Sequence, residues 1–495
     1  MRKSGILLPI ASLPSKYGIG SFSKSAYEFV DQLKLAGQMY WQILPIGPTG
    51  YGDSPYQSFS TFAGNPYFID LDQLVKKGLL TTEECEKADF GNDARYIDYE
   101  KIYFSRFPIL KKAFKRSDLS TDKNYFEFNK ENAYWLDDYA LYMAIKDSKG
   151  GLSWIEWEED IKVRKKEAIE EYKVKLKEDI DFYKFVQFVF IEQWNRLKKY
   201  ANDNGIKIVG DIPIYVALDS ADSWSNPELF QFDENLEPIA VSGCPPDDFA
   251  KDGQLWGNPL YTWDLHKETG YDWWISRISY CFKLYDVVRI DHFKGFDEYY
   301  SIAYGSKNAC IGEWKKGPGI DLFQAIDDRL GKLDIIAEDL GYITDSVRAL
   351  LKKTGFPGMK ILQFAFDSKS DEQSDYLPHN YDRNCVVYTG THDNRTINDW
   401  ITRISDDDVD YILNYIDRSH DDLENINWHL IRAAQSSVAN LCVIPIQDYL
   451  GLGEEARINE PSTVGLNWKW RLLEGEITDD LLKQIRGITK LYGRI

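Results

Sequence analysis

Residues 287–290 form a short apolar run that carries an arginine, Arg289, and is followed directly by Asp291 and His292. Four such residues bounded by polar ones are too few for a helix and predict a buried parallel strand. Arg289 is costly to bury there unless a carboxylate pairs with it. Asp291 would lie where the strand meets a loop, which is where α/β barrels collect catalytic groups. Taken alone, the same residues fit a structural ion pair and a capping aspartate equally well.

Runs of the same kind recur along the chain, mostly with helix-length segments between them. Alternation of strand and helix predicts an α/β protein with a parallel sheet, and eight units predict a closed (β/α)8 TIM barrel. The predicted strands are residues 5–10, 40–44, 206–209, 287–290, 334–339, 359–364, 386–388 and 441–445. The predicted helices are residues 23–36, 99–115, 133–145, 161–186, 273–285, 322–330, 344–353 and 478–491.

Two stretches are too long to be ordinary barrel connections. Residues from about 50 to 180 are polar, aromatic and rich in Lys and Glu, with helical periodicity, and predict a mainly helical insertion subdomain. Its charge-dense stretch 156–177 is expected to be a solvated helix face. A second, Gly- and Pro-rich stretch at about 212–265, with 219–263 expected as loop, predicts loop insertions. The 50 residues after Pro445 are too few for a C-terminal β-sandwich domain of about 100 residues. Residues 1–495 are therefore expected to form one catalytic barrel.

Composition narrows the partners of such a barrel. A formal net charge of −20 argues against nucleic acid or an anionic membrane, because both require a basic face. The six cysteines are scattered, which indicates neither a disulfide framework nor a zinc site. We find neither a signal peptide nor a 20-residue apolar stretch, so a cytoplasmic location is expected. Aromatic residues make up 15% of the chain and suit the flat faces of sugars, although large barrels also use aromatics to fill their helix layers.

Acidic side chains follow several of the predicted strands. If the barrel forms, these carboxylates face one pocket, because barrel active sites lie on the rim at the strand carboxyl ends. Converging carboxylates without a His/Cys ligand cluster are typical of enzymes that cleave glycosidic bonds, which need an acid and a second carboxylate. A divalent metal site is the competing interpretation. The positive charges of Arg289, His292 and His392 would compete with a metal ion, which weakens this second interpretation. Neither a metal nor a cofactor is therefore expected. The acids are Asp211, Asp291, Glu338, Asp367 and Asp393.

With these motifs the chain resembles the amylomaltases, which are the 4-α-glucanotransferases of glycoside hydrolase family 77 and are related to the α-amylases. The resemblance covers nearly the whole length, and the order and spacing of the motifs are more specific than any single one. The motifs are PTGYGDSPYQ at 48–57, GDIP at 210–213, DGQLWGNP at 252–259, RIDHF at 289–293, AEDLG at 337–341 and THDN at 391–394.

The resemblance implies a retaining double displacement on maltooligosaccharides and α-1,4-glucans. Asp291 resembles the nucleophile, Glu338 the acid and base, and Asp393 the stabiliser of the transition state. Strand alternation points Asp339 away from Glu338, toward a role in backbone hydrogen bonding. The residues implied in substrate binding are Tyr51, Ser54, Tyr56, Asp211, Gln254, Trp256, Arg289, His292, Asp367, His392 and Asn459.

One position departs from the family pattern. Arg-x-Asn-x-Pro-Gly-Thr is common near the C-terminus of family members, and this chain has Ser462 in place of the glycine. The change affects the loop that would cover the cleft, and hence acceptor preference. Two rival functions remain at this level: an α-glucan hydrolase of the α-amylase type, and a non-catalytic α-glucan-binding protein.

Overall fold

The computed structural model describes residues 2–50, 52–246, 251–341, 343–370, 374–463 and 465–495. Eight parallel strands form its central sheet, in the order β10-β11-β12-β1-β2-β3-β6-β9. The strands are β1 (Lys3–Leu7), β2 (Tyr40–Gln42), β3 (Lys207–Pro213), β6 (Val287–Asp291), β9 (Ile335–Ala337), β10 (Gly358–Ile361), β11 (Cys385–Tyr388) and β12 (Leu441–Pro445).

The sheet curls into a barrel whose two end strands approach each other. The main-chain N–H of Ala337 donates to the carbonyl of Pro357 at 3.0 Å, next to the start of β10. The N–H of Met359 donates to the Asp339 carboxylate at 2.6 Å. These two bonds join β9 to β10, so the predicted eight-stranded barrel is confirmed. They also confirm that Asp339 turns away from Glu338, as strand alternation predicts.

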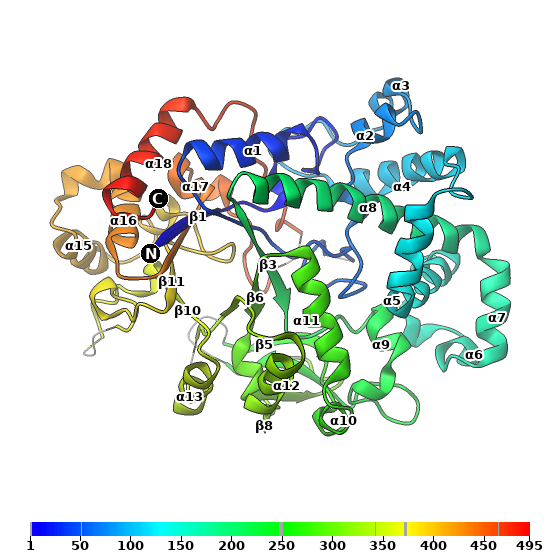
Figure 1. The fold of residues 1–495 in the computed structure, drawn as a ribbon. Helices are drawn as coiled ribbons and strands as arrows, with labels where there is room; N and C mark the ends of the chain where they lie inside the picture. Colours follow the sequence, from blue (N-terminus) through cyan, green and yellow to red (C-terminus); the bar gives the residue numbers. More distant parts are fainter. Residues whose placement is uncertain (1, 51, 247–250, 342, 371–373, 464) are drawn as a thin grey trace.

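Helices cover the outside of the barrel (Figure 1). In α1, buried side chains recur at helical spacing: Ala26, Phe29, Val30 and Leu33 pack inward. Among the described residues, no helix has the length and apolar character that crossing a bilayer requires. The outer helices are α1 (Lys24–Leu35), α8 (Lys177–Asp203), α11 (Asp272–Leu284), α12 (Ile320–Leu330), α13 (Asp345–Thr354), α14 (Ile397–Trp400), α15 (Asp406–Tyr415), α16 (Ile426–Ser436), α17 (Ile446–Leu450) and α18 (Asp479–Leu491).

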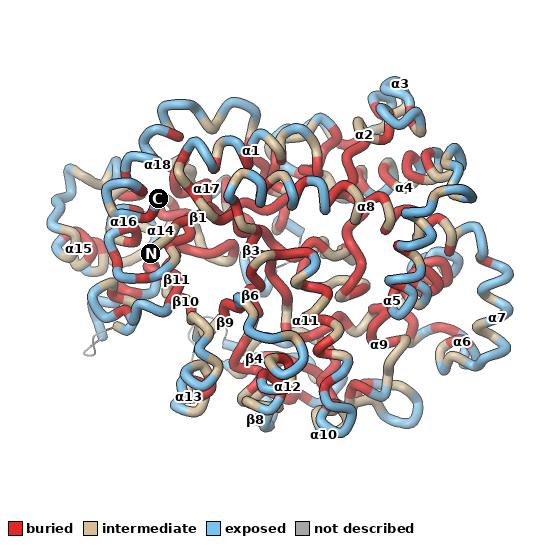
Figure 2. Tube along the Cα trace, in the orientation of Figure 1, coloured by how far each residue is buried: buried red, intermediate tan, exposed pale blue. Residues whose placement is uncertain are grey.

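The long connection between β2 and β3 is helical, and its helices lie together at one side of the molecule in Figure 1. The helix predicted at 161–186 is wrong in extent, because the chain breaks at Arg164, where φ is +56°, and again at Leu176. No residue of α7 is buried, as Figure 2 also shows, so no core holds one long helix together there. That this connection is an insertion subdomain stays a prediction. Its helices before α8 are α2 (Leu71–Lys76), α3 (Thr82–Glu86), α4 (Tyr99–Arg116), α5 (Lys123–Ser148), α6 (Glu159–Lys162) and α7 (Lys166–Lys175).

A second, antiparallel sheet was not predicted: two of its strands lie within 240–259, in the stretch expected as loop, and two lie within 298–316, for which no element was predicted. Its order is β5-β4-β7-β8, and Val241 of β4 pairs with Ile302 of β7, about 60 residues further on. A local pattern does not reveal such a partner, and the glycines in β4 and β5 imitate loop composition. The elements are α9 (Ala221–Ser225), β4 (Ala240–Cys244), β5 (Gln254–Pro259), α10 (Trp263–Glu268), β7 (Glu298–Ala303) and β8 (Glu313–Lys316).

Candidate active site

A buried ion pair lies under the mouth of the barrel. Asp211 of β3 and Arg289 of β6 are register partners, and Arg289 Nη1 lies 2.7 Å from Asp211 Oδ2. The two side chains are 0% and 3% exposed. Arg289 Nη2 also lies 3.0 Å from Oδ1 of Asp291, two residues along the same strand and hence on the same face. Burial acts to lower the pKa of Arg289, but the charges of Asp211 and Asp291 outweigh it and raise that pKa. The carboxylate partner that the sequence requires for Arg289 is therefore present.

Glu338 follows β9 directly, beside the end of β6. Its Oε2 accepts from the N–H of His292 and its Oε1 from the N–H of Leu340, both at 2.7 Å. The left-handed backbone of His292, with φ +55°, turns that N–H toward Glu338. Burial and then the charge of Asp291 raise the pKa of Glu338 to about 7, against the opposing effects of Arg289 and the two N–H donors. Glu338 can therefore hold or release a proton near neutral pH.

Asp393 reaches the same place from the loop after β11. Its Oδ1 accepts from Asn459 Nδ2 at 2.6 Å, and its Oδ2 lies 3.3 Å from His392 Nε2. Tyr56 joins this group to the ion pair, since its hydroxyl donates to Asp211 at 2.8 Å and lies 2.9 Å from His392 Nε2. Side chains from two barrel loops, from strands β3 and β6 and from the C-terminal segment thus meet in one network.

These groups line a cleft of about 370 Å³. Most of the predicted site residues lie in its wall: Ser54, Tyr56, Gln254, Trp256, Asp291, His292, Glu338, His392, Asp393 and Asn459. Asp211 and Arg289 lie beneath it as the buried ion pair. Asp367 is exposed and accepts from the N–H of Lys369, outside the described wall of the cleft. The sixth strand ends at Ile361, before the predicted 364, so Asp367 is not at a strand end. Tyr51 lies outside the described residues.

Trp256 forms one side of the cleft from strand β5. Its Nε1 donates to Gln254 Oε1 at 3.1 Å, and its ring stands edge-on to His292 at 4.8 Å. Burial lowers the pKa of His292 to about 4, so its ring is neutral near pH 7. The Nε2 of His292 is buried and has no hydrogen-bond partner among the described residues, and His292 as a residue lines the cleft.

Sequence reasoning missed two aromatic residues of the cleft. Tyr215 follows β3 by two residues and lies near both Trp256 and His292, at ring-centroid distances of 6.4 Å. Trp468 also lines the cleft and contacts Tyr56 and His392, with ring centroids 5.9 Å from each. The place of Tyr215 just after a strand end was a usable signal, whereas Trp468 arrives from far along the chain.

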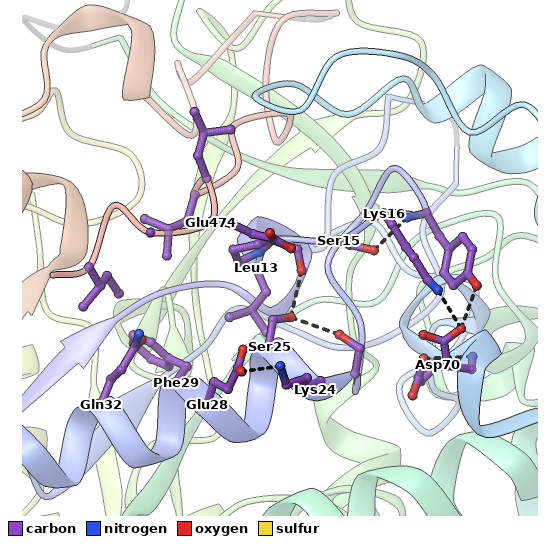
Figure 3. Close-up of a pocket in the computed structure, with 18 residues that line it drawn as sticks. Leu13, Ser15, Lys16, Lys24, Ser25, Glu28, Phe29, Gln32, Asp70 and Glu474 are labelled. Atoms are coloured by element: carbon purple, nitrogen blue, oxygen red, sulfur yellow. Dashed lines mark hydrogen bonds and ion pairs between the residues drawn. The ribbon is translucent and has the colours of Figure 1, made fainter. Parts of the chain in front are cut away.

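A larger cavity lies elsewhere. It measures about 420 Å³ and lies between the β1–α1 loop, the start of α1 and residues 472–477 (Figure 3). Both of its lysines are paired with carboxylates, Lys24 with Glu28 at 2.9 Å and Lys16 with Asp72 at 3.1 Å. None of the predicted site residues lines it. Size alone therefore misidentifies the site, and we assign it to the smaller cleft.

The site has the character of an acid–base site. Among the described residues, no group of three or more His, Cys, Asp or Glu side chains is arranged to hold a metal ion. Asp291 and Asp211 are instead paired with Arg289. A carboxyl group of pKa near 7, beside a carboxylate held by arginine at the mouth of a parallel barrel, defines the class of barrel enzymes that act on glycosidic bonds.

Comparison with known proteins places the chain within that class. The family model for 4-alpha-glucanotransferase matches residues 8–476, and the chain belongs to this family. The 4-alpha-glucanotransferase of Clostridium butyricum is 51% identical over 98% of this chain and 99% of its own length. That of Streptococcus pneumoniae is 50% identical over 100% and 98%.

Solved structures agree with this assignment. The amylomaltase from Streptococcus agalactiae, in complex with acarbose, superposes with a TM-score of 0.96 at 43% identity and covers all of both chains. The amylomaltase from Corynebacterium glutamicum has a TM-score of 0.76 at 19% identity, over 100% of this chain and 74% of its own, and supports the fold alone.

Ser462, where the family favours glycine, stands in a strained turn at the cleft. Residues 460–463 have the pattern of a type II turn: Pro461 is second, Ser462 has φ +64°, and the N–H of Thr463 donates to the carbonyl of Glu460 at 3.2 Å. The third position of such a turn favours glycine because a Cβ is strained there.

We therefore expect Ser462→Gly to raise the free energy of unfolding by up to about 1 kcal/mol. Urea denaturation measures it. Ser462→Ala is the matched control, since it removes the hydroxyl but keeps the Cβ. If the alanine variant gains as much as the glycine variant, backbone strain is not the cause.

Proposed function

We propose that this 4-alpha-glucanotransferase breaks an α-1,4 bond of a maltooligosaccharide in two displacements that pass through a covalent glucosyl-enzyme. The observation that carries the proposal is the electrostatic contrast between two neighbouring carboxyl groups. Glu338 is tuned to a pKa of about 7, and Asp291 is held by the guanidinium of Arg289 at 3.0 Å. One group suits proton transfer and the other suits nucleophilic attack.

In the first displacement, a carboxylate oxygen of Asp291 attacks the anomeric carbon while Glu338 protonates the departing O4. Both Glu338 oxygens already accept a main-chain N–H, so the proton occupies a remaining lone pair. Asp393 would hydrogen-bond sugar hydroxyls as the ring flattens, with its carboxylate held by Asn459. His292 Nε2, which lacks a protein partner, would bind another hydroxyl.

In the second displacement, the ionised Glu338 removes the proton from an incoming 4-hydroxyl, whose oxygen forms a bond to the anomeric carbon as the bond from that carbon to Asp291 breaks. Whether a sugar or water ends the intermediate depends on how well water is excluded. Trp256, Tyr215 and Trp468 line the cleft with rings on which glucose units can stack. A stacked acceptor sugar displaces water from these rings, which favours transfer to a sugar.

Incubation with maltotriose tests the activity directly. We expect glucose together with a ladder of oligosaccharides longer than the substrate, because each transferred segment lengthens an acceptor. Chromatography of the products over time separates the outcomes. Glucose and maltose without longer products would mean that water is the acceptor, and would overturn the proposed transfer.

The pKa of Glu338 predicts how turnover depends on pH. Burial and Asp291 disfavour the charged form, so the acid persists up to about pH 7 instead of about pH 4.5. The first displacement needs this proton. We therefore expect kcat/KM for maltotriose to fall about tenfold per pH unit above that value.

Rates measured from pH 5 to 9 give the profile. α-Maltosyl fluoride is the control donor, because its leaving group needs no proton. Its glycosylation step should lack the alkaline fall, and an identical fall would exclude Glu338 as the group responsible.

A further inference from the structure

One buried carboxylate outside the cleft clamps both ends of the loop that carries Asp393. Asp448, in the short helix α17 after β12, is 2% exposed. Its Oδ2 accepts from the hydroxyl of Thr389 at 2.5 Å, and its Oδ1 accepts from the N–H of Ile397 at 2.9 Å. Thr389 follows β11 directly, and Ile397 begins α14. The two oxygens of one side chain thus fix where the loop of residues 389–397 leaves the barrel and where it returns.

Bonds within the loop transmit this position to Asp393. Asn394 Oδ1 accepts from the N–H and the hydroxyl of Thr391, at 2.8 and 2.9 Å. The Thr391 hydroxyl also lies 3.2 Å from the N–H of Asp393. Between its clamped ends the loop is therefore a tight turn with little freedom, and the partly exposed Asp393 side chain stands at its tip.

Asp448 is an expensive residue to bury for a purely structural purpose. Among the described residues, no Lys, Arg or His forms an ion pair with it, so two hydrogen bonds alone compensate the burial of its charge. Burial raises the pKa of Asp448 to about 6, against the effect of those bonds. An apolar side chain would fill the same space at lower cost, whereas only a double acceptor holds both ends of the loop.

We infer that Asp448 is a positioning residue for the glucan-transfer reaction: its carboxylate, through Thr389 and Ile397, sets the position of Asp393 against the flattened sugar ring. This inference rests on the transition-state role proposed for Asp393. A displacement of Asp393 by a fraction of an ångström weakens hydrogen bonds that matter most in the transition state. The expected signature is a loss in kcat with substrate affinity retained.

The chain offers a closely matched control. Asp222 of α9 is also buried, at 4% exposed, and also accepts from one threonine, Thr61, through its hydroxyl and its N–H, both at 2.8 Å. Thr61 does not line the cleft. Thr389→Val and Thr61→Val therefore each remove one hydroxyl donor from a buried carboxylate in the same fold.

We expect Thr389→Val to lower kcat for maltotriose roughly tenfold or more, with KM changed less than about twofold, and Thr61→Val to leave both within about twofold. Thr389→Ser, which keeps the hydroxyl, should restore the rate. Should Thr389→Val fail to fold, Thr389→Ala replaces it with Thr61→Ala as its control, because alanine removes the same hydroxyl donor and adds no bulk.

Acarbose binding provides a second measurement, because a variant that is only less stable should bind acarbose with unchanged affinity. Acarbose carries a flattened ring, so its Kd should rise by the factor by which kcat/KM falls. The affinity for maltotriose, measured in a Glu338→Gln background, should stay unchanged. Equal effects of the two valine variants, or a lower kcat with unchanged acarbose binding, would overturn the inference. If Asp393→Ala itself leaves turnover intact, the proposed role of Asp393 fails instead.

Discussion

Replacement of Asp291 by asparagine is expected to lower the turnover of maltotriose by about 10⁴-fold or more. The amide is nearly the same size but cannot form the covalent ester, and it removes the negative charge that faces Arg289 at 3.0 Å. Loss of that charge should also lower the pKa of Glu338, because the charge of Asp291 is the second largest cause of its rise after burial. The variant therefore loses the nucleophile and at the same time lowers the pKa of the acid, Glu338.

Asp286→Asn is the control at the opposite end of the same strand. Asp286 precedes β6 and accepts from the N–H of Ile208 and from Asn202, both at 2.8 Å, away from the cleft. Turnover should be unchanged in this variant. Residual activity of Asp291→Asn close to that of Asp286→Asn would rule out Asp291 as the nucleophile.

Azide adds a chemical test of the same role. In Asp291→Gly the vacated space admits azide, which should attack α-maltosyl fluoride from the side of the missing carboxylate. A C–N bond forms as the C–F bond breaks and fluoride leaves, giving β-maltosyl azide with inverted configuration. Product of the α configuration, or no gain in rate with azide, would contradict the placement of the nucleophile.

The barrel could be predicted from the sequence because its signals are local. Each strand is a short apolar run in a polar context, and residues 287–290 already contain the arginine whose burial demands a carboxylate. The partner itself, Asp211, could be proposed only from its place at another strand end, and its pairing with Arg289 is a property of the register. The antiparallel sheet was not predicted because β4 and β7 are far apart in the sequence and pair only in the folded chain.

The site residues likewise fall into two groups, those that the local sequence indicates and those whose place depends on the fold. Asp291 and Glu338 are attached to strand ends, so the topology of a barrel brings them together once the strands are known. Trp468 comes from a segment whose position depends on packing over the whole chain, and no local pattern indicates it, whereas Asp448 follows the end of β12 by three residues, a signal that was left unused. Asp367 shows the converse, since the strand was predicted three residues too long, and the structure has Asp367 six residues after β10 and outside the described wall of the cleft.

Glu338→Gln is expected to slow the turnover of maltotriose by about 10³- to 10⁴-fold, because the O4 leaving group then departs without a proton. The amide NH2 must also face one of the two main-chain donors that Glu338 now accepts, His292 N–H or Leu340 N–H. One of these bonds is lost, at a cost of about 1 kcal/mol in stability. Thermal denaturation measures that cost separately from the loss of rate.

The adjacent acid provides the matched control. Asp339 is one residue away and has a pKa that burial raises to about 6, yet its carboxylate accepts from the N–H of Met359 on the far side of the strand. Asp339→Asn keeps an acceptor for that N–H and should leave turnover nearly unchanged. Equal losses in the two variants would mean that a buried charge in this region, and not proton transfer by Glu338, determines the rate.

α-Maltosyl fluoride then distinguishes the two duties proposed for Glu338. Fluoride needs no proton to leave, so the first displacement should proceed in Glu338→Gln. The second displacement should stall, because no base activates the acceptor hydroxyl. The covalent maltosyl-enzyme should therefore accumulate and appear in intact-protein mass spectra as a gain of one maltosyl unit, lost when Asp291 is also replaced. A Glu338→Gln variant that consumes the fluoride without this adduct would show that Glu338 is not the base of the second step, since deglycosylation would then keep pace without it.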